Sequence, residues 1–196
     1  MNEQLVNGVV ARRYWENPPG DNGDWFGVSP IGECGQTEVY YRHYEELRHL
    51  KRIVNFSKEK TVLELGSGAG RWVLSLAPLV KSYIAVDSSY RMLEIAKCRV
   101  DTMNLTNVIF NQCSLQEFIP MGKFDIIYLS GVSQYLNDED LDLFLQRLKF
   151  SLEPSGILID RSTVHRRSRA NLETDDYFSV YRTSEEIIQI FQKHGL

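Results

Sequence analysis

The chain has 196 residues, of which 43% are hydrophobic and 24% are charged, and its formal net charge is −4. This length suits one domain with a short appendage, and the balance of apolar and charged residues excludes a disordered chain. No stretch approaches the roughly 18 apolar residues that a membrane-spanning helix needs, and the acidic balance argues against general binding of nucleic acid.

The three cysteines, Cys34, Cys98 and Cys113, are odd in number and widely spaced. They form neither a disulfide framework nor a paired-cysteine metal site, so we predict no metal centre. Residues 1–13 lack the continuous apolar run of a secretory signal. We therefore expect a cytoplasmic protein with no membrane partner.

Residues 1–36 differ in composition from the rest of the chain, because they hold three prolines, many glycines and two tryptophans. Glycine and proline at this density break regular structure. We predict a loop-rich N-terminal arm or lid over residues 1–36 and one domain over residues 37–196. The aromatic anchors of the arm would be Tyr14, Trp15, Trp25 and Phe26.

After residue 36, short apolar runs alternate with amphipathic segments. The predicted strands are Thr61–Leu65, Tyr83–Val86, Asn107–Asn111, Phe124–Leu129 and Gly156–Asp160. The predicted helices cover residues 37–55, 71–79, 89–102, 138–152 and 184–195. This alternation predicts an α/β fold, in which helices cover both faces of a parallel sheet.

The strongest functional signal is the run Val62–Arg71, in which an apolar strand enters a turn with glycine at three alternate positions, Gly66, Gly68 and Gly70. Glycines let a ligand approach the backbone closely, and the helix that follows offers free N–H groups at its positive end. Asp87 ends the second predicted strand, where a carboxylate can accept hydrogen bonds from both hydroxyls of a ribose.

Three interpretations of this turn compete. A dinucleotide-binding turn would read GxGxxG, and here the third glycine comes one residue early. A tight strand–helix turn without any ligand would also use these glycines. An acidic residue, Glu64, stands two positions before GxGxG. This arrangement resembles motif I of the class I methyltransferases that depend on S-adenosylmethionine (SAM), and the resemblance covers residues 37–196.

The resemblance implies a Rossmann-like three-layer sandwich with a parallel sheet of strand order 3-2-1-4-5. It implies SAM as the cofactor and S-adenosylhomocysteine as its product. The methionine moiety would lie along Gly66, Ser67 and Gly68, its carboxylate beside Arg71, and the ribose on Asp87. The complete set of implied cofactor residues is Glu64, Gly66, Ser67, Gly68, Gly70, Arg71, Asp87, Ser88, Met92, Ser114, Leu115, Ser130 and Gly131.

The adenine side of the implied site departs from the family pattern. Ser88 and Met92 would flank the adenine. After the third strand, family members often read Gly-Asp-Ala, whereas this chain reads Cys113-Ser114-Leu115. Ser114 can still accept a hydrogen bond from the adenine amino group, and Leu115 could offer backbone contacts.

The acceptor side is expected at the carboxyl ends of the fourth and fifth strands. Ser130 and Gly131 would lie beside the sulfonium and its methyl group. Tyr135 either shapes the acceptor pocket or packs under the next helix. The long loop 162–182 holds His165, which is the best candidate for a general base, although a solvent-exposed loop histidine without a catalytic role also explains it. The arginines and tyrosines of this loop could grip an anionic acceptor or simply be solvated.

Three functions follow from these residues. The main prediction is methyl transfer from SAM to a small-molecule acceptor, such as a sugar-containing or anionic metabolite, without a nucleic-acid partner. The second is a protein or peptide methyltransferase, because the segment 175–182 faintly resembles N-terminal peptide methyltransferases. The third is a SAM-binding regulatory subunit without catalysis. The sequence leaves a homo-oligomer open.

The C-terminal end carries one more expectation. Family members usually add an antiparallel hairpin after the helix that corresponds to residues 184–194, and here no residues remain to build it. The chain is either a fragment or a domain without that hairpin. We expect the open edge of the fifth strand to be covered by the N-terminal arm or by a second molecule.

Overall fold

The computed structural model describes residue 10 and the ranges 13–16, 36–174 and 177–196. Its centre is a five-stranded parallel sheet of order β3-β2-β1-β4-β5, which confirms the predicted order. The strands are β1 (Thr61–Leu65), β2 (Ser82–Asp87), β3 (Val108–Gln112), β4 (Phe124–Ser130) and β5 (Leu152–Arg161). Because β1 pairs with both β2 and β4, its carboxyl end lies where the strand order reverses, which is the usual ligand position in open α/β sheets.

The helices connect these strands at the predicted places. They are α2 (Gln36–Ile53), α3 (Arg71–Leu76), α4 (Tyr90–Thr102), α5 (Asp138–Leu148) and α6 (Ser184–Lys193). The side chains of Ser89, Asn137 and Thr183 accept backbone N–H bonds at the starts of α4, α5 and α6, as N-caps do. Predicted helix 138–152 is shorter than expected, because a 3-10 turn over Lys149–Ser151 ends it and β5 begins at once.

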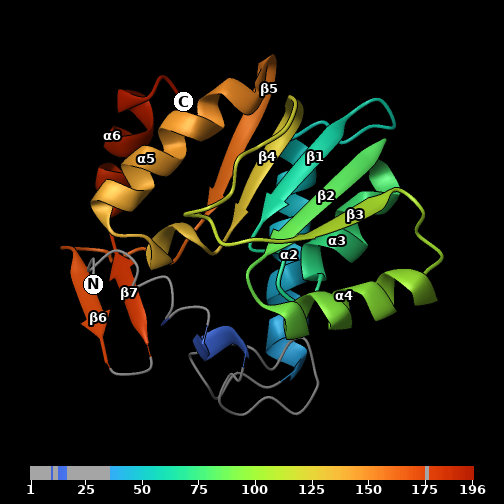
Figure 1. The fold of residues 1–196 in the computed structure, drawn as a ribbon, viewed down its shortest axis with the longest axis horizontal. Coiled ribbons are helices and arrows are strands. Elements are labelled where there is room, and N and C mark those ends of the chain that lie inside the picture. The colour runs from blue at the N-terminus through green and yellow to red at the C-terminus, as the bar shows by residue number, and fades with distance from the viewer. Residues whose placement is uncertain (1–9, 11–12, 17–35, 175–176) are drawn as a thin grey trace.

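The two faces of the sheet carry separate halves of the core. Successive strand residues point to opposite faces, so Val62 packs with helices α2 and α3, whereas Leu63 packs with α5 and α6. Figure 1 shows this arrangement, with α5 and α6 on one side of the strands and α2 and α3 on the other. The predicted three-layer sandwich is therefore confirmed.

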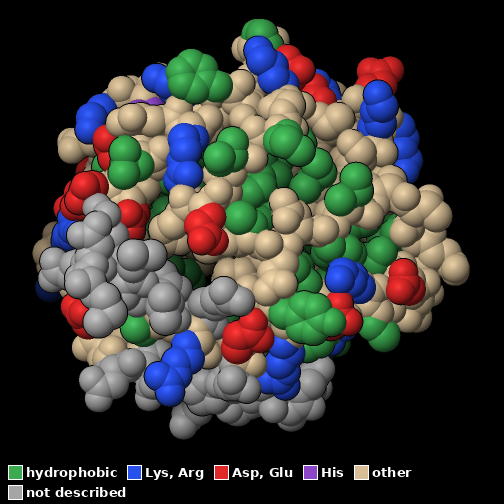
Figure 2. Space-filling view, in the orientation of Figure 1, with side chains coloured by type: hydrophobic (Ala, Val, Ile, Leu, Met, Phe, Trp, Pro, Cys, Tyr) green, Lys and Arg blue, Asp and Glu red, His purple; other side chains and the backbone are tan. Residues whose placement is uncertain are grey.

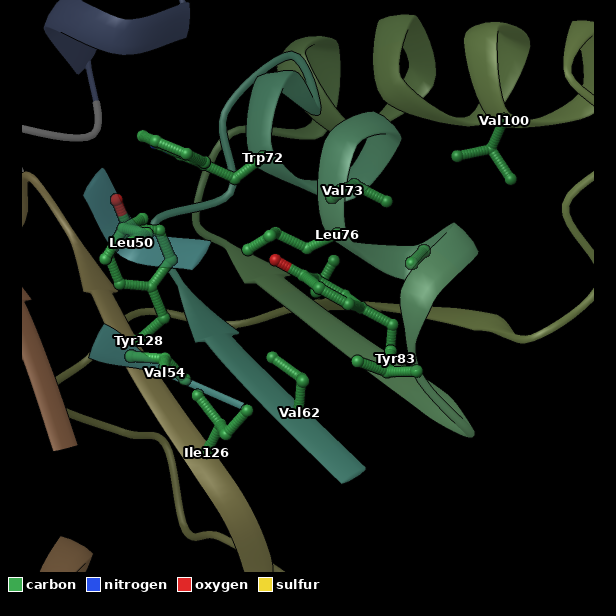
Figure 3. Packing of buried hydrophobic residues seen from close by; sticks show 13 residues of the cluster. Leu50, Val54, Val62, Trp72, Val73, Leu76, Tyr83, Val100, Ile126 and Tyr128 are labelled. Atoms are coloured by element: carbon green, nitrogen blue, oxygen red, sulfur yellow. The ribbon is translucent and has the colours of Figure 1, made fainter. Parts of the chain in front are cut away.

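Trp72 belongs to the half of the core drawn in Figure 3. Its ring is 1% exposed and meets the ring of Tyr128 edge-on, with 5.3 Å between centroids. Large aromatic side chains bury enough apolar area to hold a helix firmly on a sheet. Trp72 follows the glycine turn by two residues, so this packing also fixes the turn.

The segment 162–182 is not the plain loop that we expected. It contains the antiparallel hairpin β6 (Ala170–Glu173) and β7 (Phe178–Tyr181), which forms a separate two-stranded sheet before α6. The alternation in 178–181 is short and interrupted by polar residues, and this hid the strand. In Figure 1 the hairpin lies at the end of the molecule that faces residues 13–16.

In the described part of the chain β5 pairs with β4 alone, and the predicted cover on its outer edge stays a prediction. Residues 17–35, which we expected as one cover, lie outside the described residues. On the face drawn in Figure 2, acidic and basic side chains are interspersed around hydrophobic ones that gather over the strands. None of the described helices is long and apolar enough to cross a membrane.

Candidate cofactor and acceptor site

Asp87 is held in one orientation at the carboxyl end of β2. Its two carboxylate oxygens accept hydrogen bonds from the backbone N–H groups of Gly68, at 2.8 Å, and Ser89, at 2.9 Å. Burial raises the pKa of Asp87, and these hydrogen bonds limit the rise. Since each carboxylate oxygen can accept a second hydrogen bond, both ribose hydroxyls can still donate to Asp87.

The glycine turn leaves room for a ligand at one position and none at another. Gly68 has a φ of 51°, and a Cβ placed on it would meet nothing within 4 Å. Gly66 has a φ of 80°, and a Cβ there would lie 2.0 Å from a methyl carbon of Val132. Gly66 therefore lets the loop after β4 approach β1, while Gly68 is the open cradle.

The buried hydroxyl of Ser67 also indicates that a ligand fits at this turn. Its Oγ is buried and has no hydrogen-bond partner among the described residues. Buried polar atoms normally find a partner, so an unpaired hydroxyl beside an open cradle is a place where a polar ligand fits. The residues of the turn, with Asp87 opposite, fit the amino-acid and ribose parts of SAM. Gly70 closes the turn as the N-cap of α3 and packs against Ala96.

Glu64 is fully buried under the turn. The hydroxyl of Tyr83 donates a hydrogen bond of 2.9 Å to its Oε2 atom. Burial raises the pKa of Glu64 to about 8, although hydrogen bonds from Tyr83 and Ser130 and the charge of Arg71 lower it. A cation close to Glu64 would favour the ionised carboxylate.

Arg71 lies in a charged cluster that sequence reasoning found only in part. Arg161 donates two hydrogen bonds of 2.9 Å to the carboxylate of Glu46 on α2, and Arg71 approaches the same carboxylate at 4.0 Å. Burial lowers the pKa of Arg71, and the nearby charge of Arg161 lowers it further. One carboxylate thus faces two guanidinium groups, and a second carboxylate beside Arg71 would balance the charge.

The adenine side is built partly as expected. Met92 is buried, and Ser88 lies beside Asp87 at the end of β2. The hydroxyl of Ser114 donates to Glu117 at 2.9 Å, and the carbonyl of Leu115 accepts from Arg147 at 3.2 Å. Both adenine candidates are therefore already tied to neighbours, although Ser114 keeps its capacity to accept.

Residues 13–16 of the arm dock at the start of α4, next to Asp87. The carbonyl of Trp15 accepts from the Ser89 hydroxyl at 3.2 Å, and the carboxylate of Glu16 accepts from the backbone N–H of Tyr90 at 2.9 Å. These bonds hold the segment beside the ribose position. Two other predicted anchors, Trp25 and Phe26, lie outside the described residues.

An aromatic cluster joins this segment to the hairpin and to the loop after β4. Tyr14 meets the ring of Tyr177 edge-on at 4.9 Å, and Trp15 meets that of Tyr135 at 5.9 Å. The hydroxyls of Tyr135 and Tyr177 are 3.5 Å apart, and that of Tyr181 lies 3.2 Å from Tyr177. We call Tyr14, Trp15, Tyr135 and Tyr177 the aromatic wall.

The aromatic wall stands next to the expected methyl position. Tyr135 belongs to the 3-10 turn η2 (Ser133–Tyr135), which follows Ser130 and Gly131 at the end of β4. Burial raises the pKa of Tyr135 to about 12, so its hydroxyl remains protonated at neutral pH. Tyr135 thus contacts Trp15 and Tyr177 at the end of β4, and its part in an acceptor pocket stays a prediction.

The predicted general base is placed differently. His165 is exposed, and its Nδ1 atom accepts from the backbone N–H of Ser168 at 3.3 Å. A second histidine, His43 on α2, is buried and bonds the hydroxyl of Ser75 on α3 at 2.8 Å. Burial lowers the pKa of His43 to about 4. The part of the chain that the structure describes holds no cluster of three or more metal-ligating side chains.

Sequence reasoning missed the residues that hold the site together. Glu46 and Arg161 are far apart in the chain, and no spacing pattern joins them. Arg182 is 2% exposed, whereas the sequence suggested that the arginines of this loop either grip an anionic acceptor or are solvated. A signal for Arg182 was present, because it stands directly before Thr183 of the capping box of α6, where the chain must return to the domain.

Comparison with known proteins places this geometry among enzymes. A family model described as a methyltransferase domain matches residues 62–156. N-terminal Xaa-Pro-Lys N-methyltransferase 1-B of Xenopus laevis is 28% identical over 192 residues, and the match covers 95% of this chain and 82% of the relative.

Solved structures share the fold. The DhpI–SAH complex has a TM-score of 0.70 and 18% identity, and the match covers 99% of this chain and 89% of that one. Phosphoethanolamine N-methyltransferase 1 of Haemonchus contortus, solved with phosphoethanolamine and S-adenosylhomocysteine, has a TM-score of 0.75 and 17% identity. That match covers 96% of this chain and 40% of the other.

Proposed function

The chain belongs to the class I SAM-dependent methyltransferases, and from this premise we propose that it methylates the N-terminal amine of a protein or peptide. The observation that carries this proposal is the likeness to N-terminal Xaa-Pro-Lys N-methyltransferases over 95% of this chain and 82% of the relative. Likeness to the phosphoethanolamine enzyme is 17% in sequence and supports only the fold. The small-molecule acceptor that the sequence first suggested therefore has weaker support than the peptide.

The cofactor half of the site supplies binding and orientation. When bound, SAM supplies a methyl group that its sulfonium makes reactive. Asp87 would bind the ribose, Gly68 would let the methionine moiety approach the backbone, and Arg71 would face its carboxylate. Ser67 would find the partner that its buried hydroxyl lacks among the described residues.

The aromatic wall suits an amine acceptor. Aromatic faces attract a cationic or partly cationic nitrogen, and tyrosine hydroxyls can hydrogen-bond it. The wall also excludes water from the methyl position, and aligned, dry reactants are most of what this transfer requires. A free α-amine has a pKa of about 8, so an appreciable fraction is neutral and nucleophilic at neutral pH without a strong base. His165 remains a prediction for the final proton.

The negative net charge of the chain favours a basic peptide as its substrate. The chain carries a net charge of −4, whereas a free N-terminus followed by lysine is positive. Opposite net charges speed encounter at low ionic strength. Residues 13–16 would act as a lid, because the Trp15 carbonyl accepts from Ser89 beside Asp87 while the Trp15 ring contacts Tyr135.

The proposal is tested by incubating the chain with SAM and a peptide that begins Xaa-Pro-Lys. Tandem mass spectrometry should find added methyl groups on the α-amine. The matched control is the same peptide with an acetylated N-terminus, which should stay unmodified. Transfer to phosphoethanolamine but not to the peptide, or equal transfer to the acetylated peptide on its lysine, would contradict the proposal.

A further inference from the structure

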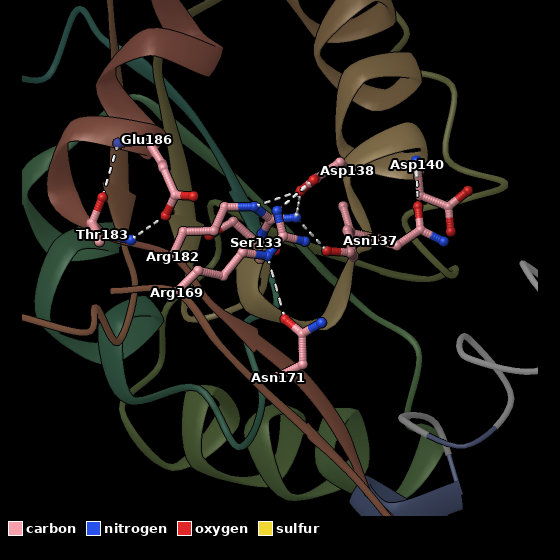
Figure 4. A network of polar contacts seen from close by, with 10 residues as sticks. Ser133, Asn137, Asp138, Asp140, Arg169, Asn171, Arg182, Thr183 and Glu186 are labelled. Atoms are coloured by element: carbon pink, nitrogen blue, oxygen red, sulfur yellow. Dashed lines mark hydrogen bonds and ion pairs between the residues drawn. The ribbon is translucent and has the colours of Figure 1, made fainter. Parts of the chain in front are cut away.

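Arg182 is a buried cation that joins the hairpin to the loop after β4. Its Nε and Nη2 atoms donate to one oxygen of Asp138 at 3.0 and 2.7 Å. Its Nη1 donates to the carbonyl of Ser133 at 3.1 Å, and Nη2 donates also to the carbonyl of Leu136 at 2.8 Å. Figure 4 shows this fan of contacts at the start of α5.

The two elements that Arg182 joins are the two sides of the aromatic wall. Ser133 and Leu136 bracket Tyr135 in the loop after β4, and Arg182 itself directly follows Tyr181, the last residue of β7. Tyr177 directly precedes that strand, and its hydroxyl lies 3.5 Å from that of Tyr135. A shift of the hairpin would therefore change the gap between these two hydroxyls.

A buried guanidinium fixes geometry because it cannot move without losing several hydrogen bonds. Its planar donors point in fixed directions, and each carbonyl that it meets must stay in place. Burial alone would raise the pKa of Asp138, but hydrogen bonds from Arg169 and Arg182 outweigh it and hold the pKa below its ordinary value. Asp138 is therefore ionised at neutral pH and neutralises the buried cation.

Arg169 provides a natural comparison. It donates to the other oxygen of Asp138 and to the side chain of Asn171, and Figure 4 shows it beside Arg182. Arg169 is exposed, however, and its hydrogen bonds go to the side chains of Asp138 and Asn171 rather than to a backbone carbonyl of the loop after β4. The two arginines thus share an ion-pair partner but differ in their contact with the loop that carries Tyr135.

We propose that Arg182 is a positioning residue, which sets the separation between Tyr135 and Tyr177 through the carbonyls of Ser133 and Leu136 and thereby sets acceptor affinity. The role of the wall in acceptor binding rests on the proposed function. The ion pair with Asp138 neutralises Arg182, and the carbonyl bonds position the wall.

The test compares Arg182→Lys with the matched control Arg169→Lys. A lysine amine keeps the charge but cannot reach Asp138 and both carbonyls together. We expect Arg182→Lys to raise the peptide KM about tenfold, the worth of one or two charge-assisted hydrogen bonds, with SAM affinity by calorimetry unchanged. Arg169→Lys should change neither value. A merely destabilised enzyme would lower kcat through its folded fraction and leave the peptide KM unchanged.

A second measurement keeps the test valid for any acceptor. Amide hydrogen exchange should become faster in residues 131–137 and 177–181 of Arg182→Lys together, and not in Arg169→Lys. Should Arg182→Lys fail to fold, Arg182→Gln replaces it and should give the same changes, because one amide group cannot donate to both carbonyls in the same geometry. Unchanged exchange in both segments of a folded variant, or an unchanged peptide KM, would overturn the inference. Wild-type enzyme that ignores the peptide would overturn the proposed function, and the exchange result would still decide the role of Arg182.

Discussion

Two backbone N–H groups, from Gly68 and Ser89, orient the Asp87 carboxylate at the end of β2. Asp87→Asn replaces one oxygen by an amide group that cannot accept a hydrogen bond. We expect SAM affinity to fall at least about tenfold, since each charge-assisted hydrogen bond is worth roughly 1.5–3 kcal/mol. Titration calorimetry on the folded variant measures the change.

The matched control for Asp87→Asn is Asp125→Asn, because Asp125 stands at the opposite end of the sheet and bonds Lys60 and Thr61. Its loss should reduce stability and leave SAM affinity as it is. Equal SAM affinity in wild type and Asp87→Asn would remove Asp87 from the cofactor site.

The raised pKa of Glu64 leads to a prediction about how the stability of the chain depends on pH. Its pKa of about 8 in the folded chain lies above the ordinary 4.5, so between these values the folded state binds more protons than the unfolded state. The contribution of Glu64 to stability is therefore fully present below about pH 4.5 and is lost as pH rises toward 8. Glu64→Gln should lose less stability than wild type between pH 5 and pH 8 in urea denaturation.

The exposed carboxylate of Glu59 provides the control, since Glu59→Gln should keep the wild-type dependence on pH. A wild-type profile and a Glu64→Gln profile that run parallel from pH 5 to 8 would show that the folded chain does not hold Glu64 protonated.

At the scale of elements, the arm segment 13–16 makes a further prediction. Trp15 contacts Tyr135 through its ring and Ser89 through its carbonyl. An aromatic pair is worth about 0.5–1.5 kcal/mol, so Trp15→Ala should weaken SAM binding about fivefold, because it loosens the segment that bonds Ser89 and Tyr90 beside Asp87. Tyr44→Ala removes an exposed aromatic ring from α2 and should have no effect. A fivefold loss in both variants, or in neither, would argue against the lid.

The elements themselves were largely predictable, because their signals are local. The short, continuously buried run of β1 and the caps Ser89, Asn137 and Thr183 follow from neighbouring residues. The hairpin β6–β7 was missed because its four-residue strands depend on contact with the aromatic wall rather than on a long apolar pattern.

In the candidate site, too, residues joined by a local motif were predictable and residues joined by long-range contacts were not. The glycine turn and Asp87 form a motif whose spacing is fixed by backbone geometry, so the sequence alone predicts that they lie together. Arg182 and the pair of Glu46 with Arg161 are joined across 44 or more positions, and no local pattern connects them. Long-range polar contacts of this kind become visible only in the folded chain.

At the scale of the whole molecule, the sheet brings both halves of the reaction to one end. The carboxyl ends of β1 and β2 carry the predicted cofactor residues, and those of β4 and β5 lead into the loop and hairpin of the aromatic wall. The strand order 3-2-1-4-5 places these pairs side by side, with the switch point between β1 and β4. An acceptor amine would therefore enter from the hairpin side and meet the methyl group beside Ser130.

The central claim is tested most directly by a crystal structure of the chain with S-adenosylhomocysteine and a peptide that begins Xaa-Pro-Lys. The account predicts the ribose hydroxyls on Asp87, and the α-amine between Tyr135 and Tyr177, facing the cofactor sulfur. A peptide bound with its N-terminus away from the sulfur, or a nucleoside seated elsewhere than on the glycine turn, would contradict it.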